Sequence, residues 1–200
     1  MKLVTTLLLI STIAILSCKP KVFTPKPRGY YAIALPKHDY TLFNKAGFPY
    51  QFEYPSYGTI LKDSTMTQNM KDQNGIAYWI NVDFPQWNAR IYLSYKNMNG
   101  VADLEKLLND AHELSFVHTK KADYINEPEF HNDSTHVHGV YYDVGGNAAS
   151  AVQFFATDSN KHYLRGALYF NVTPNADSLQ PMVEFLSKDI EHLIKTLRWK

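Results

Sequence analysis

Residues 150–172 read SAVQFFATDSNKHYLRGALYFNV, and this stretch decides the fold. Two runs rich in aromatic and aliphatic residues, 150–157 and 162–172, flank the polar segment 158–161. Aromatic and β-branched residues favour strands, whereas Asp, Ser and Asn favour turns. Strands joined by so short a connection must pair in antiparallel fashion, because a parallel crossover needs about a dozen residues or more. The stretch therefore predicts a β-hairpin.

Segments on both sides of this hairpin predict further strands and two helices. Alternation of large and polar side chains, broken at turn residues, predicts strands at 30–35, 50–54, 76–84, 89–96, 125–130 and 137–144. Apolar residues at three- and four-residue spacing predict one helix from 101 toward 121 and another from 177 to 197. We therefore expect an α+β fold, with a single twisted, mostly antiparallel sheet and two main helices packed on it.

The amino terminus predicts export and lipid attachment. The apolar run at 3–16 follows Lys2 and is shorter than the ~20 residues of a membrane-spanning helix. The sequence ILSC at 15–18 is similar to a bacterial lipobox. We expect a lipoprotein signal peptide at 1–17, with a diacylglycerol on the thiol of Cys18 and an N-acyl chain such as palmitate on its amine. A plain signal peptide followed by an incidental free cysteine is the alternative.

Composition and charge limit the remaining possibilities. After the acylated Cys18, a tether rich in proline and lysine extends to residue 28, and residues 29–200 are expected to form a single globular α+β domain. Cys18 is the only cysteine, so an intrachain disulfide is excluded. A formal net charge of +1 offers no basic field for nucleic acid, so we expect a membrane contact through the lipid anchor and no nucleic-acid partner.

Catalytic and metal-binding patterns are weak. The chain lacks GxSxG, GxGxxG and P-loop motifs, so no catalytic residue and no cofactor besides the covalent lipid is expected. Three of the eight histidines, His131, His136 and His138, are weak candidates for a metal site. His136 and His138 would share a face if both lay on one strand, with His131 across the turn. Solvated histidines at a sheet edge are the alternative, and we expect no metal.

Two predicted turns carry the candidate contact residues for a partner protein. Glycines and Asn suit left-handed turn positions, and small residues also allow a partner backbone to approach closely. We expect the turns to share one surface, formed by Gly145, Gly146, Asn147, Asp158, His162 and Arg165. A purely structural role in the two hairpins is the alternative, and Arg165 is equally suited to an internal pair.

Long stretches of the chain resemble one known family. They are TPKPRGY (24–30), FEYP (52–55), IYLSYK (91–96), KADYINEPEF (121–130), 145–170 from GGNAAS to ALYF, and 174–199 from PNADS to TLRW. These segments closely resemble the gliding-motility lipoprotein GldD family of Bacteroidota. The resemblance extends from the tether to Trp199 and places the lipidated cysteine of the family at Cys18. The order of elements is also similar to the PsbP/Mog1-like α/β/α fold, an analogy that concerns the fold alone.

The resemblance implies a role in an envelope machine. It implies a non-enzymatic structural or assembly component of the gliding apparatus, linked to type IX secretion, whose partners are other gliding or secretion proteins. Since no acidic residue directly follows Cys18, we expect a periplasm-facing rather than a cell-surface protein. We also expect it on the outer rather than the inner membrane. A periplasmic metal- or ligand-binding carrier that uses His131, His136 and His138 is the alternative. A cell-envelope hydrolase is a weaker third hypothesis.

Overall fold

The computed structural model describes residues 33–62 and 78–200. The predicted signal peptide, the acylated Cys18 and the tether at 18–28 lie outside the described residues. Ala34–Lys200 forms one compact unit. In the part of the chain that the structure describes, every helix is too short or too polar to span a bilayer.

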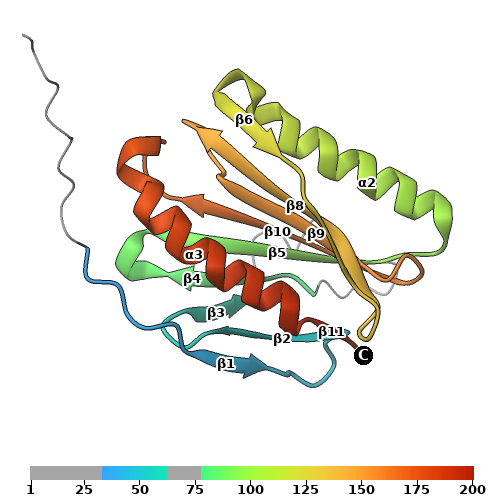
Figure 1. The fold of residues 1–200 in the computed structure, drawn as a ribbon. Coiled ribbons are helices and arrows are strands. Elements are labelled where there is room, and N and C mark those ends of the chain that lie inside the picture. The colour runs from blue at the N-terminus through green and yellow to red at the C-terminus, as the bar shows by residue number, and fades with distance from the viewer. Residues whose placement is uncertain (1–32, 63–77) are drawn as a thin grey trace, which may run out of the picture. The chain divides into compact units, whose positions relative to one another are not determined.

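A large antiparallel sheet of eight strands lies at the centre of this unit (Figure 1). Its strands, in spatial order, are β3 (Thr59–Lys62), β4 (Ile80–Phe84), β5 (Ala89–Asn97), β10 (His162–Phe170), β9 (Val152–Thr157), β8 (Val137–Gly146) and β6 (Ala122–Asn126), with β7 (Glu129–Asn132) also paired to β8. The predicted hairpin at 150–172 is confirmed as β9 and β10, which pair from Tyr163↔Thr157 to Leu168↔Val152. The hairpin lies inside the sheet, flanked by β8 and β5.

A second, three-stranded sheet corrects the expectation of a single sheet. It consists of β1 (Tyr40–Phe43), β2 (Tyr50–Pro55) and β11 (Arg198–Trp199). β11 has two residues, too few to show any periodicity, and its partner β2 is far away in the sequence. The expected strand at 30–35 is also wrong where it can be judged, because residues 33–35 form no strand. The α+β class, with two helices on mostly antiparallel sheets, is confirmed.

The two main helices lie close to their predicted positions. α2 covers Val101–Phe116 and α3 covers Ala176–Thr196. Short 3-10 helices occur at Pro85–Trp87 (η1) and Val117–Lys120 (η2), so the predicted extension of α2 toward 121 takes the tighter form. The side chain of Asn175 caps α3 by accepting a hydrogen bond from the backbone N–H of Ser178, at 3.2 Å.

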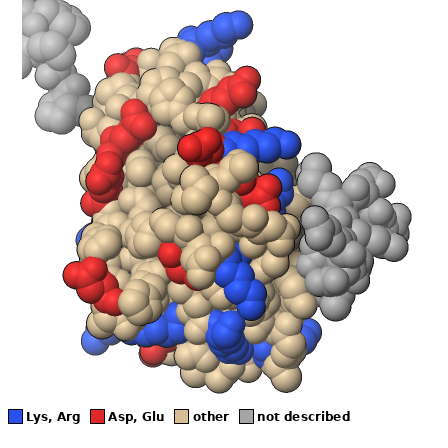
Figure 2. All heavy atoms as spheres, turned by 90° about the vertical axis from the view of Figure 1, so that its right-hand side faces the viewer, with Lys and Arg blue, Asp and Glu red and all other residues tan. Residues whose placement is uncertain are grey.

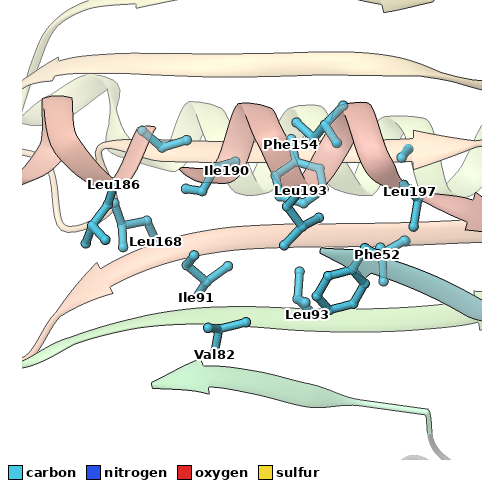
Figure 3. Packing of buried hydrophobic residues seen from close by; sticks show 14 of the residues in the cluster. Phe52, Val82, Ile91, Leu93, Phe154, Leu168, Leu186, Ile190, Leu193 and Leu197 are labelled. Carbon is cyan, nitrogen blue, oxygen red and sulfur yellow. The ribbon is translucent and has the colours of Figure 1, made fainter. Parts of the chain in front are cut away.

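Each helix covers a different face of the large sheet, because successive side chains of a strand point to opposite faces. α3, which crosses in front of the sheet in Figure 1, buries its apolar stripe together with the small sheet. Leu186, Ile190 and Leu193 of α3 point toward the sheet residues Leu168 and Ile91 in Figure 3. On the other face, α2 packs over β8, β9 and β10 through a smaller cluster that contains Leu107, Ala111, Tyr142, Phe155 and Tyr163. The domain therefore has α/β/α layers.

Candidate binding groove

α2 leaves part of its sheet face uncovered, and a groove of about 1130 Å³ lies beside it. Leu107, Ala111 and Leu114 of α2 form one wall. The floor consists of side chains from three strands that point away from α3, namely Asn81 and Asp83 of β4, Arg90, Tyr92, Ser94 and Lys96 of β5, and Tyr163, Arg165, Ala167 and Tyr169 of β10. Leu114 is 47 % exposed and Tyr92 is 39 % exposed, so apolar and aromatic surface is open to an occupant.

One end of the groove carries paired charges and aromatic rings. Arg90 Nε donates to Asp83 Oδ1 at 2.6 Å, and this hydrogen bond holds the pKa of Arg90 above its usual value. The Arg90 guanidinium also lies 5.7 Å from the centroid of the Tyr92 ring. Tyr92 meets Tyr169 edge-to-face, with ring centroids 5.7 Å apart. The charges at this end therefore largely neutralise each other.

The floor also carries Arg165, a cation that has no carboxylate partner among the described residues. Arg165 Nη2 donates to the neutral Oε1 of Gln153. No ion pair in the described part of the chain includes Arg165. Arg165 also affects a neighbouring histidine. Burial lowers the pKa of His118, and the positive charge of Arg165 lowers that pKa further. Gln153 is 1 % exposed, and its Nε2 has no hydrogen-bond partner among residues 33–62 and 78–200.

The structure does not bring the predicted contact residues together. Gly145 and Gly146 end β8, and Asp158 and His162 flank the turn at the opposite end of β9. Of the six residues, only Arg165 lines the groove. The two turns lie at opposite ends of β9, and turn signals in the sequence do not reveal this separation.

The first turn, which contains Gly145, Gly146 and Asn147, is packed against other residues of the same domain. A Cβ added at Gly145 would lie 2.1 Å from Cε1 of Tyr124, so the close approach that this glycine permits is internal. Asn147 Oδ1 accepts a hydrogen bond from the backbone N–H of Ala176 at 2.8 Å, which ties the turn to the start of α3. These glycines and Asn147 therefore have clear structural roles.

The second turn is also internally bonded. Asp158 Oδ1 accepts from the backbone N–H groups of Asn160, Lys161 and His162. Burial raises the pKa of Asp158, but these hydrogen bonds outweigh it and the net pKa is lowered. His162 is buried, with Nδ1 2.7 Å from the Tyr95 hydroxyl oxygen, and burial lowers its pKa.

The three candidate histidines form a pair rather than a triad. His131 and His138 face each other across β7 and β8, with ring centroids 5.6 Å apart. His136 lies in the turn before β8, with φ of 52°. It is therefore not on the same strand as His138, and the two do not share a strand face as expected. His131 Nε2 bonds to Asp133, and His138 Nε2 lies 2.6 Å from Ser159 Oγ. Within the described ranges, no group of three or more His, Cys, Asp or Glu is placed to hold a metal ion.

A buried carboxylate on α3 was not predicted from the sequence. Asp189 is 1 % exposed and accepts hydrogen bonds from the hydroxyls of Tyr57 at 2.6 Å and Tyr40 at 3.1 Å. His38 Nδ1 lies 2.7 Å from Asp189 Oδ1 and is bonded to it. The spacing of Asp189 in the sequence could have indicated its burial. Asp189 lies three residues after Leu186 and four before Leu193, so it falls on the apolar stripe of α3.

Half-buried tyrosines make the domain sensitive to alkali. Burial, together with the charge and hydrogen bond of Asp189, raises the pKa of Tyr40 from 10.0 to about 12. Burial also raises the pKa of Tyr141 to about 12. The folded state thus holds these protons more tightly than the unfolded state, so their contribution is complete below about pH 10 and is lost as the pH rises toward about 12. We expect the melting temperature of the full-length chain to fall steeply in this interval, as measured by circular dichroism.

The matched variant for this expectation is Tyr40→Phe, which removes one of the titrating groups. It should make the decline above about pH 10 shallower, although the variant loses a hydrogen bond to Asp189 at every pH. A melting temperature that stays constant from about pH 9 to about pH 12 would contradict the expectation.

Comparisons with known proteins agree with this architecture. A solution structure titled cyanobacterial PsbP (CyanoP), from Synechocystis sp. PCC 6803, matches with a TM-score of 0.50 and 11 % sequence identity. The match covers 88 % of this chain and 98 % of that chain. At this identity the likeness shows the fold alone, so the class of protein is an α+β domain with a PsbP-like fold.

The family follows from the sequence comparison. The family model described as "Gliding motility lipoprotein GldD" matches residues 20–199, and the chain belongs to this family. A search of the curated proteins finds no match. The family membership makes the chain a gliding-motility lipoprotein, anchored to a membrane of the cell envelope.

Proposed function

We propose that this lipoprotein is a non-enzymatic docking component of the gliding apparatus, linked to type IX secretion. In this proposal the lipid on Cys18 holds the protein on the periplasmic face of the outer membrane, and the groove beside α2 binds another protein of the apparatus. The proposal assigns no catalytic residue, no metal and no cofactor other than the covalent lipid.

The groove is the observation that supports this function best. Its volume of about 1130 Å³ is slightly above the roughly 300–1000 Å³ of small-molecule pockets. Tyr, Trp and Arg, the residues enriched at the centres of protein interfaces, contribute Trp79, Tyr92, Tyr169 and Arg165 to its lining. The paired Asp83 and Arg90 add polar groups of the kind that fix orientation at an interface. A groove of this size and composition suits a segment of a protein.

The lipid anchor is tested by Cys18→Ala. A chain with several acyl groups stays on the membrane, whereas a chain without them has no anchor, so we expect the variant to move from the membrane fraction to the soluble fraction. We also expect cells that carry only this variant to lose spreading on agar, as the deletion strain should. Lys21→Ala, in the same tether, is the control and should keep both properties.

Two results would overturn the proposal. Normal spreading of the deletion strain would remove the role in gliding, and full membrane retention of Cys18→Ala would remove the lipid anchor. Density-gradient separation of the two membranes tests the outer-membrane assignment, because the wild-type chain should migrate with outer-membrane markers.

A further inference from the structure

We infer that the groove beside α2 binds an extended acidic segment of a partner protein, with one carboxylate of that segment paired to Arg165. The inference rests on the proposed function, because it names the chemistry of the partner at the same site. It follows from the charge of the groove floor, from the spacing of its cations and from the kind of surface that the floor presents.

Arg165 is the anchor of this inference. Its guanidinium is half-buried on the central strand β10, where its described partner is the uncharged amide of Gln153. A partly desolvated cation gains most from a carboxylate, and the planar guanidinium can bind both carboxylate oxygens at once. The other arginine of the floor, Arg90, already has Asp83 at 2.6 Å. The site for an incoming carboxylate is therefore Arg165.

A second cation lies one step along the floor. Arg165 pairs with Ser94 in the β5–β10 register, and Lys96 is two residues further along β5 on the same face. Diagonal neighbours of this kind are about 7–8 Å apart. In an extended segment, alternate residues are about 6.6 Å apart. The two cations thus match acidic residues at alternate positions of an extended partner segment.

The rest of the floor selects against other occupants. β4, β5 and β10 are each paired on both sides, so this floor offers no free backbone edge for strand addition. An amphipathic helix would need an apolar floor, whereas Ser94, Lys96 and Arg165 give this floor polar and charged side chains. Asp110 adds a carboxylate to the α2 wall of the groove, and it would help to orient the segment by repelling its acidic side. Beyond the cations, the exposed Tyr92 and its neighbour Tyr169 offer an aromatic contact.

The test begins with crosslinking in cells. A photoactivatable benzoylphenylalanine at position 92, in the full lipidated chain, is expected to capture a protein. Mass spectrometry of the crosslinked peptide should show acidic residues at alternate positions. In the same background Arg165→Glu should reduce the crosslink yield at least about tenfold, and changing the captured acidic residue to arginine should restore it.

Matched variants separate binding from folding. Lys188→Glu makes the same charge reversal on the exposed side of α3, away from the groove, and should leave the yield unchanged. Arg165→Gln removes the charge with less disturbance of Gln153 and should also reduce the yield. Melting temperatures close to that of the wild type show that each variant is folded.

Several outcomes would overturn the inference. These are a crosslink to a glycan, to a lipid, to a second copy of this chain or to another segment of the same chain, and a protein crosslink that Arg165→Glu and Arg165→Gln leave intact. If the inference fails in one of these ways while the deletion strain still cannot spread, the proposed role in gliding stands. If the deletion strain spreads normally, the proposed function itself fails.

Discussion

Replacing Asp189 with alanine is expected to lower the free energy of unfolding by about 3–5 kcal/mol. The carboxylate side chain is fully buried and accepts hydrogen bonds from Tyr57, Tyr40 and His38. Its loss leaves three donors that were arranged around one anion, and it also opens a cavity under α3. Urea unfolding of the full-length chain, followed by fluorescence, measures the change.

An exposed aspartate provides the control for this prediction. The side chain of Asp133 is 89 % exposed and pairs at the surface with His131, whose side chain is 65 % exposed, so Asp133→Ala should change the free energy of unfolding by less than about 1 kcal/mol. If both variants were destabilised equally, the buried network would not contribute to stability in the way its geometry implies. Asp189→Asn keeps the size and removes the charge, and its loss should lie between those of the two alanine variants.

Leu186→Ala is expected to cost about 3–5 kcal/mol, because the cavity left in a close-packed core adds to the lost burial. Leu186 of α3 is 0 % exposed, and its side chain packs against the large sheet, next to Leu168 in Figure 3. Stability should fall without a change in the urea dependence of unfolding, since the same surface is exposed in both chains.

The same substitution at an exposed position checks this value. Leu42 of β1 is 52 % exposed, so Leu42→Ala should cost less than about 1 kcal/mol. A small loss at Leu186 comparable with that at Leu42 would mean that α3 does not hold the core as the structure describes.

The central part of the fold is predictable because its elements are long and periodic. Ile91, Leu93 and Tyr95 alternate with polar residues in the sequence, and the structure buries these three on the α3 face. The apolar stripe of α3 is likewise buried at Met182 and Leu186. In both cases the spacing of apolar residues within a single strand or helix is sufficient to predict which side chains are buried.

The remaining features depend on contacts between distant parts of the chain. Asp189 is stabilised by residues that precede it by 132 to 151 positions, and no local pattern indicates those partners. The groove depends on where α2 stops covering the sheet, so exposed Leu114 looked like part of an ordinary buried stripe. Arg165 was a candidate from the sequence, but its separation from Gly145 and Asp158 required the strand register.

Charge is distributed without a dominant sign on the face seen in Figure 2, where acidic and basic side chains both occur. Long-range attraction of a partner by the whole domain is therefore weak, in keeping with a formal net charge of +1. Recognition at the groove would depend on contacts at short range, and its salt dependence should be modest.

The last residues of the chain complete the small sheet, since β11 pairs with β2 and the backbone N–H of Lys200 donates to Pro49. Trp199 also donates from its indole N–H to the backbone oxygen of His136, at 3.0 Å. Both contacts join segments that lie far apart in the sequence, so they form only when the rest of the domain is in place. A purification tag fused directly after Lys200 would disturb these contacts, so a tag is better inserted in an exposed loop.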